Sequence, residues 1–216
     1  MSGNKEIALE ERGREERRLF SPSAARNRDA IRAAFLQTMP QAGVILEIGS
    51  GTGEHAVHIA AAAPGLRWLP GDPDAASRAS IAAWTEHCGL ANVAAPHPVD
   101  VTTKDWDAGL GAIDGIVSIN MIHIAPFEAA KGLIAGAGRL LRPGGKLFLY
   151  GPFSQGGAHT APSNEAFDAS LKARDPRWGV RDLDQDIAPL AGKEGLSLET
   201  VLKMPANNLS VIFLRR

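Results

Sequence analysis

The chain alternates short apolar runs with longer segments whose apolar residues recur at helical spacing. The runs of strand length lie at residues 44–48, 66–71, 115–119 and 146–150. The helix-like segments between them lie at residues 55–63, 75–88 and 127–141. Strands that alternate with helices predict a parallel sheet joined by right-handed crossovers, because a crossover helix has to pack back onto the sheet. We therefore expect an α/β fold.

The C-terminal part of the chain predicts two more helices and a closing hairpin. The helices are expected near residues 164–172 and 182–194, and two strand-like runs, 196–204 and 209–214, flank a Pro-Ala-Asn-Asn turn. These two runs predict an antiparallel pair at one edge of the sheet. With a further strand at 93–99, interrupted by prolines, the expectation is a Rossmann-like sheet of seven strands, mostly parallel, with helices on both faces.

The N-terminal part has two sections. Residues 5–18 mix Glu, Lys and Arg without apolar periodicity, which predicts a frayed helix or a disordered lead. Ser21-Pro22 then predicts a helix start, with Ser21 as cap and Pro22 in the first turn. We expect a charged lead over residues 1–18 and a single domain over residues 19–216.

Composition narrows the class of protein. The chain has 216 residues, a net charge of −1 and one cysteine, Cys88. Charges of both signs are mixed, so we expect no nucleic-acid partner. A single cysteine excludes an internal disulfide and a zinc–cysteine cluster, and we expect no metal site. No apolar stretch reaches about 18 residues, so we expect no membrane partner and a cytoplasmic location.

The most informative stretch is Glu47-Ile48-Gly49-Ser50-Gly51-Thr52-Gly53, which follows an apolar strand and precedes a helix. Glycines let the backbone adopt positive φ and approach a ligand closely, and a helix N-terminus offers free N–H groups. The dinucleotide fingerprint G-x-G-x-x-G would need a glycine where Glu54 stands. A carboxylate there suits a pyrophosphate poorly, whereas Glu47 suits a ligand with an ammonium group. An ordinary strand-to-helix turn is the simpler alternative.

Two further acids follow strand-like runs. Asp72 lies about 20 residues beyond the glycine turn, where a doubly wound fold brings the second strand beside the first and a carboxylate can accept ribose hydroxyls. The alternative for Asp72 is a helix cap, a position that Asp74 fills well. Asp100-Val101 ends the third run. A turn residue is the alternative for Asp100, because Thr102, Thr103 and Asp105 follow.

The pattern E-x-G-x-G-x-G, the following acids and Leu141-Arg142-Pro143-Gly144-Gly145 together resemble the class I S-adenosylmethionine-dependent methyltransferases. The resemblance implies S-adenosylmethionine as cofactor, held by the glycine turn and the acids. It implies that Asp100 lies near the adenine amino group and that Val101 packs on the adenine ring. It also implies that Asn120 and Met121, after the fourth strand, line the cofactor, and that a helix ahead of the first strand folds over it. On that helix Arg26 and Asn27 are candidates for the methionine part, Arg26 through its two-pronged fork. A surface charge is the alternative for Arg26. The cofactor-binding candidates are Arg26, Asn27, Glu47, Gly49, Ser50, Gly51, Gly53, Asp72, Asp100, Val101, Asn120 and Met121.

Several segments resemble one particular group more closely. These are the stretches Ser21–Asn27, Gly151–Phe153, Ser163–Leu171, Asp175–Asp182 and Met204–Leu209. Together they are similar to the methyltransferase-like twenty-six family, a domain of unknown function. That resemblance covers nearly the whole chain from Ser21 and implies a methyltransferase fold without a settled substrate. Gly71, where relatives commonly carry serine, and the charged lead depart from the expected pattern.

Methyl transfer from a sulfonium is an in-line displacement that needs an aligned acceptor and, for a protonated acceptor, a base. His123 is the candidate general base, because an imidazole titrates near neutral pH; a turn or packing residue is the alternative. Candidate substrate contacts come from the segments after the fourth and fifth strands and from the C-terminal region: Tyr150, Phe153, His159 on an expected mobile stretch, Trp178, Arg181 and Asn207. Packing, surface or turn roles remain open for each of them.

Three functions compete. The first is a methyltransferase that acts on a small-molecule substrate. The second is a non-catalytic protein that binds S-adenosylmethionine or its demethylated product on the same fold, because a fold does not settle activity. The third is a nicotinamide-dependent oxidoreductase, which the glycine spacing opposes. The acceptor and the oligomeric state stay open.

Overall fold

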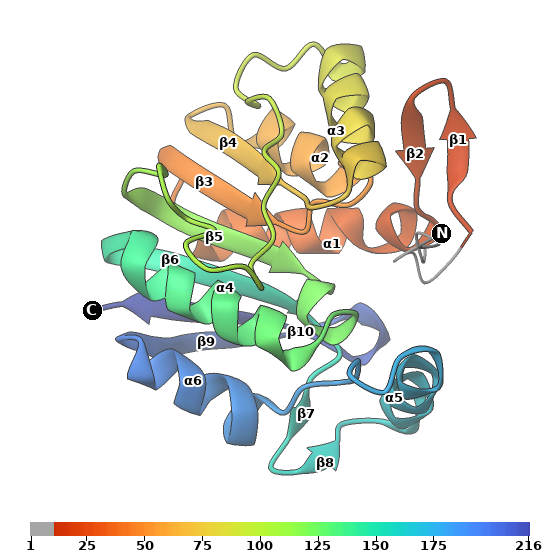
Figure 1. Cartoon of the computed structure of the whole chain (residues 1–216), viewed down its shortest axis with the longest axis vertical. Coiled ribbons are helices and arrows are strands. Elements are labelled where there is room, and N and C mark those ends of the chain that lie inside the picture. The colour runs from red at the N-terminus through yellow and green to blue at the C-terminus, as the bar shows by residue number, and fades with distance from the viewer. Residues whose placement is uncertain (1–10) are drawn as a thin grey trace.

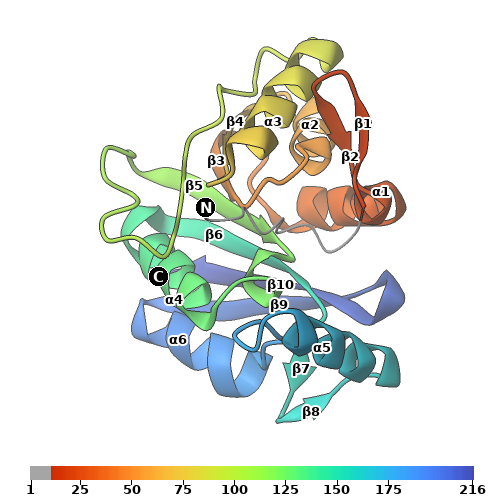
Figure 2. The same ribbon diagram turned by 45° about the vertical axis from the view of Figure 1, so that its right-hand side comes forward.

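The computed structural model describes residues 11–216 and forms three layers, with helices on both faces of one central sheet (Figures 1 and 2). The strands stand in the order β4-β3-β5-β6-β10-β9. Their bounds are β3 (Gly43–Ile48), β4 (Leu66–Gly71), β5 (Ile113–Ile119), β6 (Leu141–Gly151), β9 (Leu196–Met204) and β10 (Asn208–Arg215). The first four strands of that order run parallel, and β10 is antiparallel to both β6 and β9.

The sheet has six strands, so the expectation of seven is wrong. Residues 93–99 run beside β4 but pair with it only at Val93, opposite Trp68, and at His97, opposite Gly71. Pro96 and Pro98 have no N–H to donate, so a continuous ladder cannot form there. The chain still crosses the carboxyl end of β4, because the Asp72 N–H donates to the His97 carbonyl.

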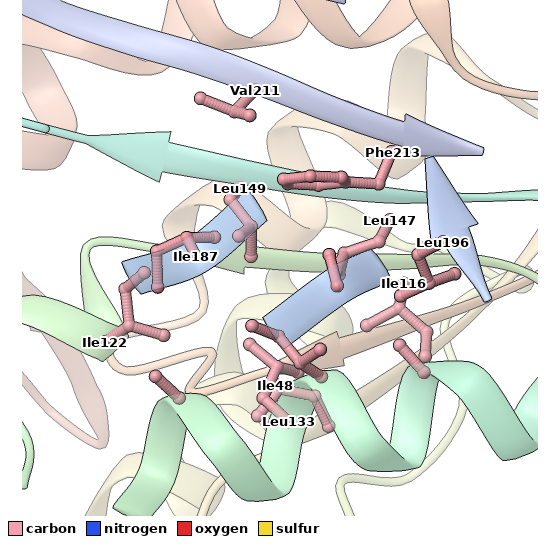
Figure 3. Packing of buried hydrophobic residues seen from close by; sticks show 14 of the residues in the cluster. Ile48, Ile116, Ile122, Leu133, Leu147, Leu149, Ile187, Leu196, Val211 and Phe213 are labelled. Carbon is pink, nitrogen blue, oxygen red and sulfur yellow. The ribbon is translucent and has the colours of Figure 1, made fainter. Parts of the chain in front are cut away.

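The two faces of the sheet carry two separate hydrophobic cores. On one face α4 (Phe127–Leu140) and α6 (Ala188–Lys193) pack against the strands, and Figure 3 shows Leu133 of α4 beneath Ile48, Leu147 and Leu149. On the other face α1 (Pro22–Thr38) and α2 (Glu54–Ala62) pack against Ile45, Trp68, Phe148 and Ile212. Alternate residues of each strand face opposite sides, so both sets are buried and the strands read as apolar runs.

Local signals set the helix boundaries. The Ser21 hydroxyl accepts the Ala24 N–H and Pro22 opens α1, as predicted. The Asp74 carboxylate caps α3 (Ala75–Cys88) by accepting the Ser77 N–H at 2.7 Å, and Gly89 ends the helix with φ +62°. A capping carboxylate and a left-handed glycine are the usual start and stop of a helix, which is why α3 begins and ends where the sequence predicts.

The remaining elements are short, apart from α5. Residues 13–20 form a hairpin of β1 (Gly13–Glu15) and β2 (Arg18–Phe20), not the frayed helix or disordered lead expected there. The rest of the expected lead, residues 1–10, lies outside the described residues. The stretch after β6 holds a second hairpin, β7 (Ser154–Gln155) with β8 (Ala158–His159), before α5 (Pro162–Arg174). Within residues 11–216 there are also three single-turn helices: η1 (Met121–His123), η2 (Leu183–Ile187) and η3 (Pro205–Asn207).

Candidate functional site

The glycine turn lies between β3 and α2 and is held against the end of β4. The N–H groups of Gly49 and Ser50 both donate to the Gly71 carbonyl, at 2.9 and 3.1 Å. The Gly51 N–H donates to Oδ2 of Asp72 at 2.9 Å. All three glycines of the turn have positive φ, between +58° and +89°. The predicted glycine turn and the predicted acid are therefore in direct contact, because β3 and β4 are parallel neighbours that end side by side.

The three glycines of the turn, Gly49, Gly51 and Gly53, differ in the space around them. A Cβ on Gly49 would lie 2.7 Å from Cγ of Met121, and a Cβ on Gly53 would lie 2.8 Å from Cα of Ile81. These two positions have no room for a side chain because other parts of the protein pack against them. A Cβ on Gly51 would meet only a guanidinium nitrogen of Arg12, at 3.8 Å. Gly51 is thus the position of the turn whose open side can face a ligand, whereas Gly49 and Gly53 serve packing.

Asp72 has one lone pair on each oxygen engaged by the backbone. Its Oδ1 accepts the Asp74 N–H at 2.9 Å, and its Oδ2 accepts the Gly51 N–H. Burial raises the pKa of this carboxyl, and those two N–H groups and the Arg12 charge oppose the rise. The backbone bonds fix the orientation of the carboxylate and leave its other lone pairs available, which is what two ribose hydroxyls would need.

Glu47 does not face the turn's open side. Its carboxylate is buried, and Oε2 accepts the indole N–H of Trp68 at 3.0 Å. Burial raises the pKa of Glu47 to about 7, with the hydrogen bond from Trp68 opposing the rise. The expected contact of Glu47 with a ligand's ammonium group therefore needs correction: the side chain lies in the core between β3 and β4. Ser50 is buried as well and lies beside Glu47.

Asp100 forms a local turn. Its Oδ1 accepts both the N–H and the hydroxyl of Thr102, at 2.9 and 2.7 Å, and its side chain is exposed. Val101 is buried, and its carbonyl lies where a Cβ on Gly132 would be, so this residue packs against α4. The turn interpretation accounts for the observed contacts of Asp100, and a contact with adenine stays a prediction.

Asn120 and Met121 lie next to the glycine turn, and that they line a cofactor stays a prediction. Asn120 adopts φ +60° at the start of η1, and its N–H donates to the Tyr150 carbonyl at 2.8 Å. Met121 packs on Gly49. The carboxyl ends of β3, β5 and β6 thus meet at one place, which is where ligands of parallel α/β sheets bind.

His123 is fully buried, which contradicts the expectation of an accessible general base. Its Nδ1 accepts the Arg181 N–H at 3.3 Å, so Nε2 carries the proton. Its ring lies edge-on to Phe153, 4.9 Å between centroids, and a Cβ on Gly151 would overlap Nε2. Burial and the Arg181 charge lower the pKa of His123 to about 3. The imidazole is neutral and enclosed by protein, so it packs η1 against the end of β6.

Asn27 joins two other elements. Its Oδ1 lies 2.9 Å from Nε2 of His55, at the start of α2, and its side chain lies near the Tyr150 phenol, where it opposes the rise in pKa that burial causes. Burial, with the nearby charges of His58 and Arg28, lowers the pKa of His55 to about 4, so the imidazole is neutral and donates to Asn27. Asn27 lies beside the end of β6 as well as the start of α2. Arg26 lies on the exposed side of α1, where it donates to the Ser23 hydroxyl at 3.2 Å.

The predicted substrate residues do not form one surface. Phe153 is buried in the core of the α4 face and Tyr150 in the core of the opposite face, so neither is an open wall. His159 lies on the β7–β8 hairpin, and its Nε2 is 3.5 Å from Oδ2 of Asp168 on α5. Trp178 is half-buried. Arg181 donates to the carbonyls of Ile122 and Ala125 and therefore braces η1. Asn207 lies in the hairpin turn and donates to Ser163, which agrees with the turn alternative.

Sequence reasoning missed Arg12 and gave His55 no role. Arg12 belongs to the charged lead, and its guanidinium reaches the glycine turn from about 40 positions away in the chain. No local pattern marks it, because its neighbours in sequence are equally charged. His55 directly follows the glycine turn, so its position in the first turn of α2 was the available signal.

Residues 11–216 lack two features, a cluster of metal ligands and a membrane-spanning helix. No group of three or more His, Cys, Asp or Glu side chains in this range is arranged to hold a metal ion. In the same range, none of the helices has the length and apolar character that crossing a membrane requires.

Comparison with known proteins identifies a family and a fold. Residues 18–215 match the family model described as "Protein of unknown function (DUF938)". Among solved structures, the mitomycin 7-O-methyltransferase MmcR is similar with a TM-score of 0.73 and 18% identity, over 90% of this chain and 54% of that one. The methyltransferase CalO1 of calicheamicin biosynthesis, in its SAH-bound form, gives a TM-score of 0.71 and 17% identity over 90% and 54%.

A third similar structure is an O-methyltransferase family 2 protein from Planctomyces limnophilus in complex with apigenin. Its TM-score is 0.74 at 16% identity, over 90% of this chain and 60% of that one. The chain thus spans between 54 and 60% of the length of these three proteins. At such identities the likeness establishes a shared methyltransferase-type fold.

Proposed function

We propose that this chain, which belongs to the DUF938 family of proteins of unknown function, is an S-adenosylmethionine-dependent methyltransferase acting on a small molecule. The observation that carries the proposal is the contact between Gly51 and Asp72. It joins the open position of the glycine turn to an acid whose remaining lone pairs are available, at the carboxyl ends of adjacent parallel strands. The fold shared with methyltransferase structures gives that contact its interpretation.

The residues fit the cofactor at its ribose and at the turn. Asp72 is oriented by two backbone N–H groups and can accept the two ribose hydroxyls, while Gly51 leaves room for the ligand beside the main chain. Met121 packs on Gly49 and the Asn120 N–H binds the Tyr150 carbonyl, so these two residues would form one wall of the cofactor site. When bound, the cofactor would supply an electrophilic methyl group on a sulfonium. Glu47 would act indirectly by holding β3 to β4 through Trp68.

The acceptor side would lie toward α1 and β6. There Tyr150 is held by Asn27, which is in turn held by His55. Ser210 stands opposite Tyr150 in the antiparallel register, and its buried hydroxyl has no hydrogen-bond partner within residues 11–216. Tyr150 and Ser210 are buried, so these groups would fix the end of β6 behind the acceptor and exclude water from that side rather than contact the acceptor. No side chain is assigned as base, because His123 is enclosed.

We further propose that the chain is a member of the methyltransferase-like twenty-six family and that its methyl acceptor is a small molecule. We also propose that the protein binds neither nucleic acid nor membrane and that it is cytoplasmic. These proposals rest on the motif resemblance, the mixed charge and the absence of a long apolar stretch in the sequence.

The test is calorimetric titration of the full chain with S-adenosylhomocysteine, with NADH as the competing ligand. We expect binding of S-adenosylhomocysteine alone, and Asp72→Asn should weaken it at least tenfold because the charged acceptor of the ribose hydroxyls is lost. Asp184→Asn is the control, since this exposed acid only accepts the Gly156 N–H on the far hairpin. Binding of NADH alone, or of neither ligand, would refute the proposal.

A second measurement separates an enzyme from a non-catalytic binder. The protein is incubated with S-adenosylmethionine and a pool of small hydroxylated and amino compounds, and methylated products are followed by mass spectrometry. Methylated product that disappears in Asp72→Asn supports the enzyme. Cofactor binding without product from a broad acceptor pool indicates the non-catalytic reading.

A further inference from the structure

The hairpin of residues 13–20 is attached firmly to α3. The Leu19 N–H donates to the Ser80 hydroxyl at 2.8 Å, and the indole N–H of Trp84 donates to the Leu19 carbonyl at 2.9 Å. Phe20 packs edge-on against Trp84 with 5.0 Å between centroids, and the Arg18 guanidinium lies 4.9 Å from the Trp84 ring. Residues 11–20, which we call the N-terminal arm, therefore have a defined position relative to the cofactor turn.

The anchor also reaches the glycine turn itself. The Ser80 hydroxyl that accepts the Leu19 N–H donates to the Thr52 carbonyl at 2.7 Å. Arm, α3 and turn are thus joined through one buried hydroxyl. In Figures 1 and 2 the β1–β2 hairpin lies alongside α3 in both views.

Arg12 extends from the arm over the turn. Its Nη1 lies 3.4 Å from the Ser77 hydroxyl on α3, and its Nη2 lies 3.8 Å from the position that a Cβ on Gly51 would take. Its charge acts on both Asp72 and Asp74. The guanidinium is therefore next to the open glycine and to the proposed ribose acceptor.

We propose that Arg12 is a cofactor-positioning residue, through which the N-terminal arm covers the ribose side of the cofactor site. The inference rests on the proposed function, because it takes Gly51 and Asp72 as the cradle. A guanidinium has five N–H donors in a planar fork, so Arg12 can donate to the ribose oxygens while its charge keeps Asp72 ionised. The arm would thereby complete the site from a segment outside the strand–helix repeat.

A purely structural role is the alternative. Two carboxylates, Asp72 and Asp74, lie close together at the start of α3, and a neighbouring cation relieves their repulsion whether or not a ligand binds. The two roles differ in what they affect. Relief of repulsion changes the stability of the free protein, whereas cofactor positioning changes ligand affinity and its dependence on pH.

The first experiment is calorimetric titration of S-adenosylhomocysteine into the wild type, Arg12→Ala, Arg12→Lys and Arg14→Ala. We expect Arg12→Ala to weaken binding about tenfold, the scale of a lost hydrogen bond from a charged donor, and Arg12→Lys to weaken it less. Arg14 is the matched control on the same arm, because it donates only to the Glu16 carbonyl and is exposed. Melting curves of each free variant measure any structural role, which would lower the melting temperature without changing affinity.

The second readout is the pH profile of binding. Asp72 must be ionised to accept two hydroxyls, so affinity falls as pH falls through its pKa. Without Arg12 that pKa rises, and in Arg12→Ala the affinity should fall at a higher pH than in the wild type or Arg14→Ala. Other charged or titratable groups around Asp72 are common to all variants, so the difference between variants reports Arg12. They are Glu47, Asp74, Arg78 and His97.

The third readout needs no variant. Trypsin cleaves after Arg12, and a cofactor held beneath the arm should slow that cleavage in the wild type, with cleavage after the exposed Arg177 as internal reference. Unchanged affinity and pH profile in Arg12→Ala, with no protection by S-adenosylhomocysteine, would overturn the inference and leave the proposed function standing. A wild type that does not bind S-adenosylhomocysteine would overturn both.

Discussion

The Trp68 indole donates a 3.0 Å hydrogen bond to the Glu47 carboxylate, and both side chains are buried between β3 and β4. The acid that opens the glycine motif is therefore part of the core beneath the turn. A carboxyl group in such a place resists ionisation, and the pKa of Glu47 is raised to about 7 mainly by burial. This relationship makes the stability of the fold depend on pH.

For Glu47 the sign follows from the raised pKa. Between the ordinary value of 4.5 and about 7 the folded state holds a proton that the unfolded state has released, so unfolding free energy falls as pH rises through that range. Glu47→Gln removes this slope and keeps an acceptor for Trp68. We expect the unfolding free energy of the variant, relative to that of the wild type, to increase by up to about 3 kcal/mol between pH 4.5 and pH 8. Urea unfolding at the two pH values measures this difference. An equal pH dependence in both proteins would mean that Glu47 ionises freely.

His123 should produce the opposite slope. Its pKa in the folded protein is about 3, below the ordinary 6.5, so the unfolded state takes up a proton first as pH falls below 6.5. Its contribution to stability is complete above pH 6.5 and is lost on acidification. In His123→Gln the unfolding free energy should change less between pH 6.5 and 4.5 than in the wild type, measured by urea titration.

Substitution of His123 distinguishes a packing role from a catalytic role. His123→Ala leaves a cavity beside Phe153 and should cost about 2–4 kcal/mol of stability. S-adenosylhomocysteine affinity of the folded variant should be unchanged, because the imidazole is enclosed. An NMR titration in which the His123 imidazole titrates near pH 6.5 would contradict this account.

Gly51 and Gly53 should respond differently to the same substitution. Both have positive φ, so Ala costs about 1–2 kcal/mol at each for backbone strain. At Gly53 the new methyl group also meets Ile81 of α3, whereas at Gly51 it makes only an ordinary contact with a guanidinium nitrogen of Arg12, at 3.8 Å. We expect Gly53→Ala to lower the melting temperature more and Gly51→Ala to weaken S-adenosylhomocysteine binding more. The reverse order in calorimetry and melting would show that the ligand does not lie against Gly51.

The contact of Asn27 with Tyr150 and His55 should be measurable as a coupling. In a double-mutant cycle of Asn27→Ala and Tyr150→Phe, the unfolding free energies should be non-additive by about 0.5–1.5 kcal/mol, because the two polar side chains are neighbours that interact. Asn27→Ala with Ser170→Ala serves as the additive reference, since the Ser170 hydroxyl donates locally to Phe167. Additivity in both cycles would mean that the network contributes nothing to the fold.

The sequence by itself determined the order and type of most elements. Alternation of apolar runs and helical periods, the Asp74 cap, Gly89 and the turn before Asn208 act through residues a few positions apart, so α3 and the closing β9–β10 pair match the predicted ranges. The contact between Gly51 and Asp72 could also be predicted, because parallel strands that adjoin must end together.

Tertiary structure decided which of these residues can meet a ligand. The alternation of residues along a strand places Glu47 and Leu46 on opposite faces of the sheet. Because both faces are buried, this alternation does not show that Glu47 would meet Trp68 in the core. The enclosure of His123 depends on Gly151 and Phe153, about 30 positions away, and Arg12 reaches Gly51 across about 40. Burial depends on contacts between segments that are far apart in the sequence, so the pattern of neighbouring residues cannot predict it.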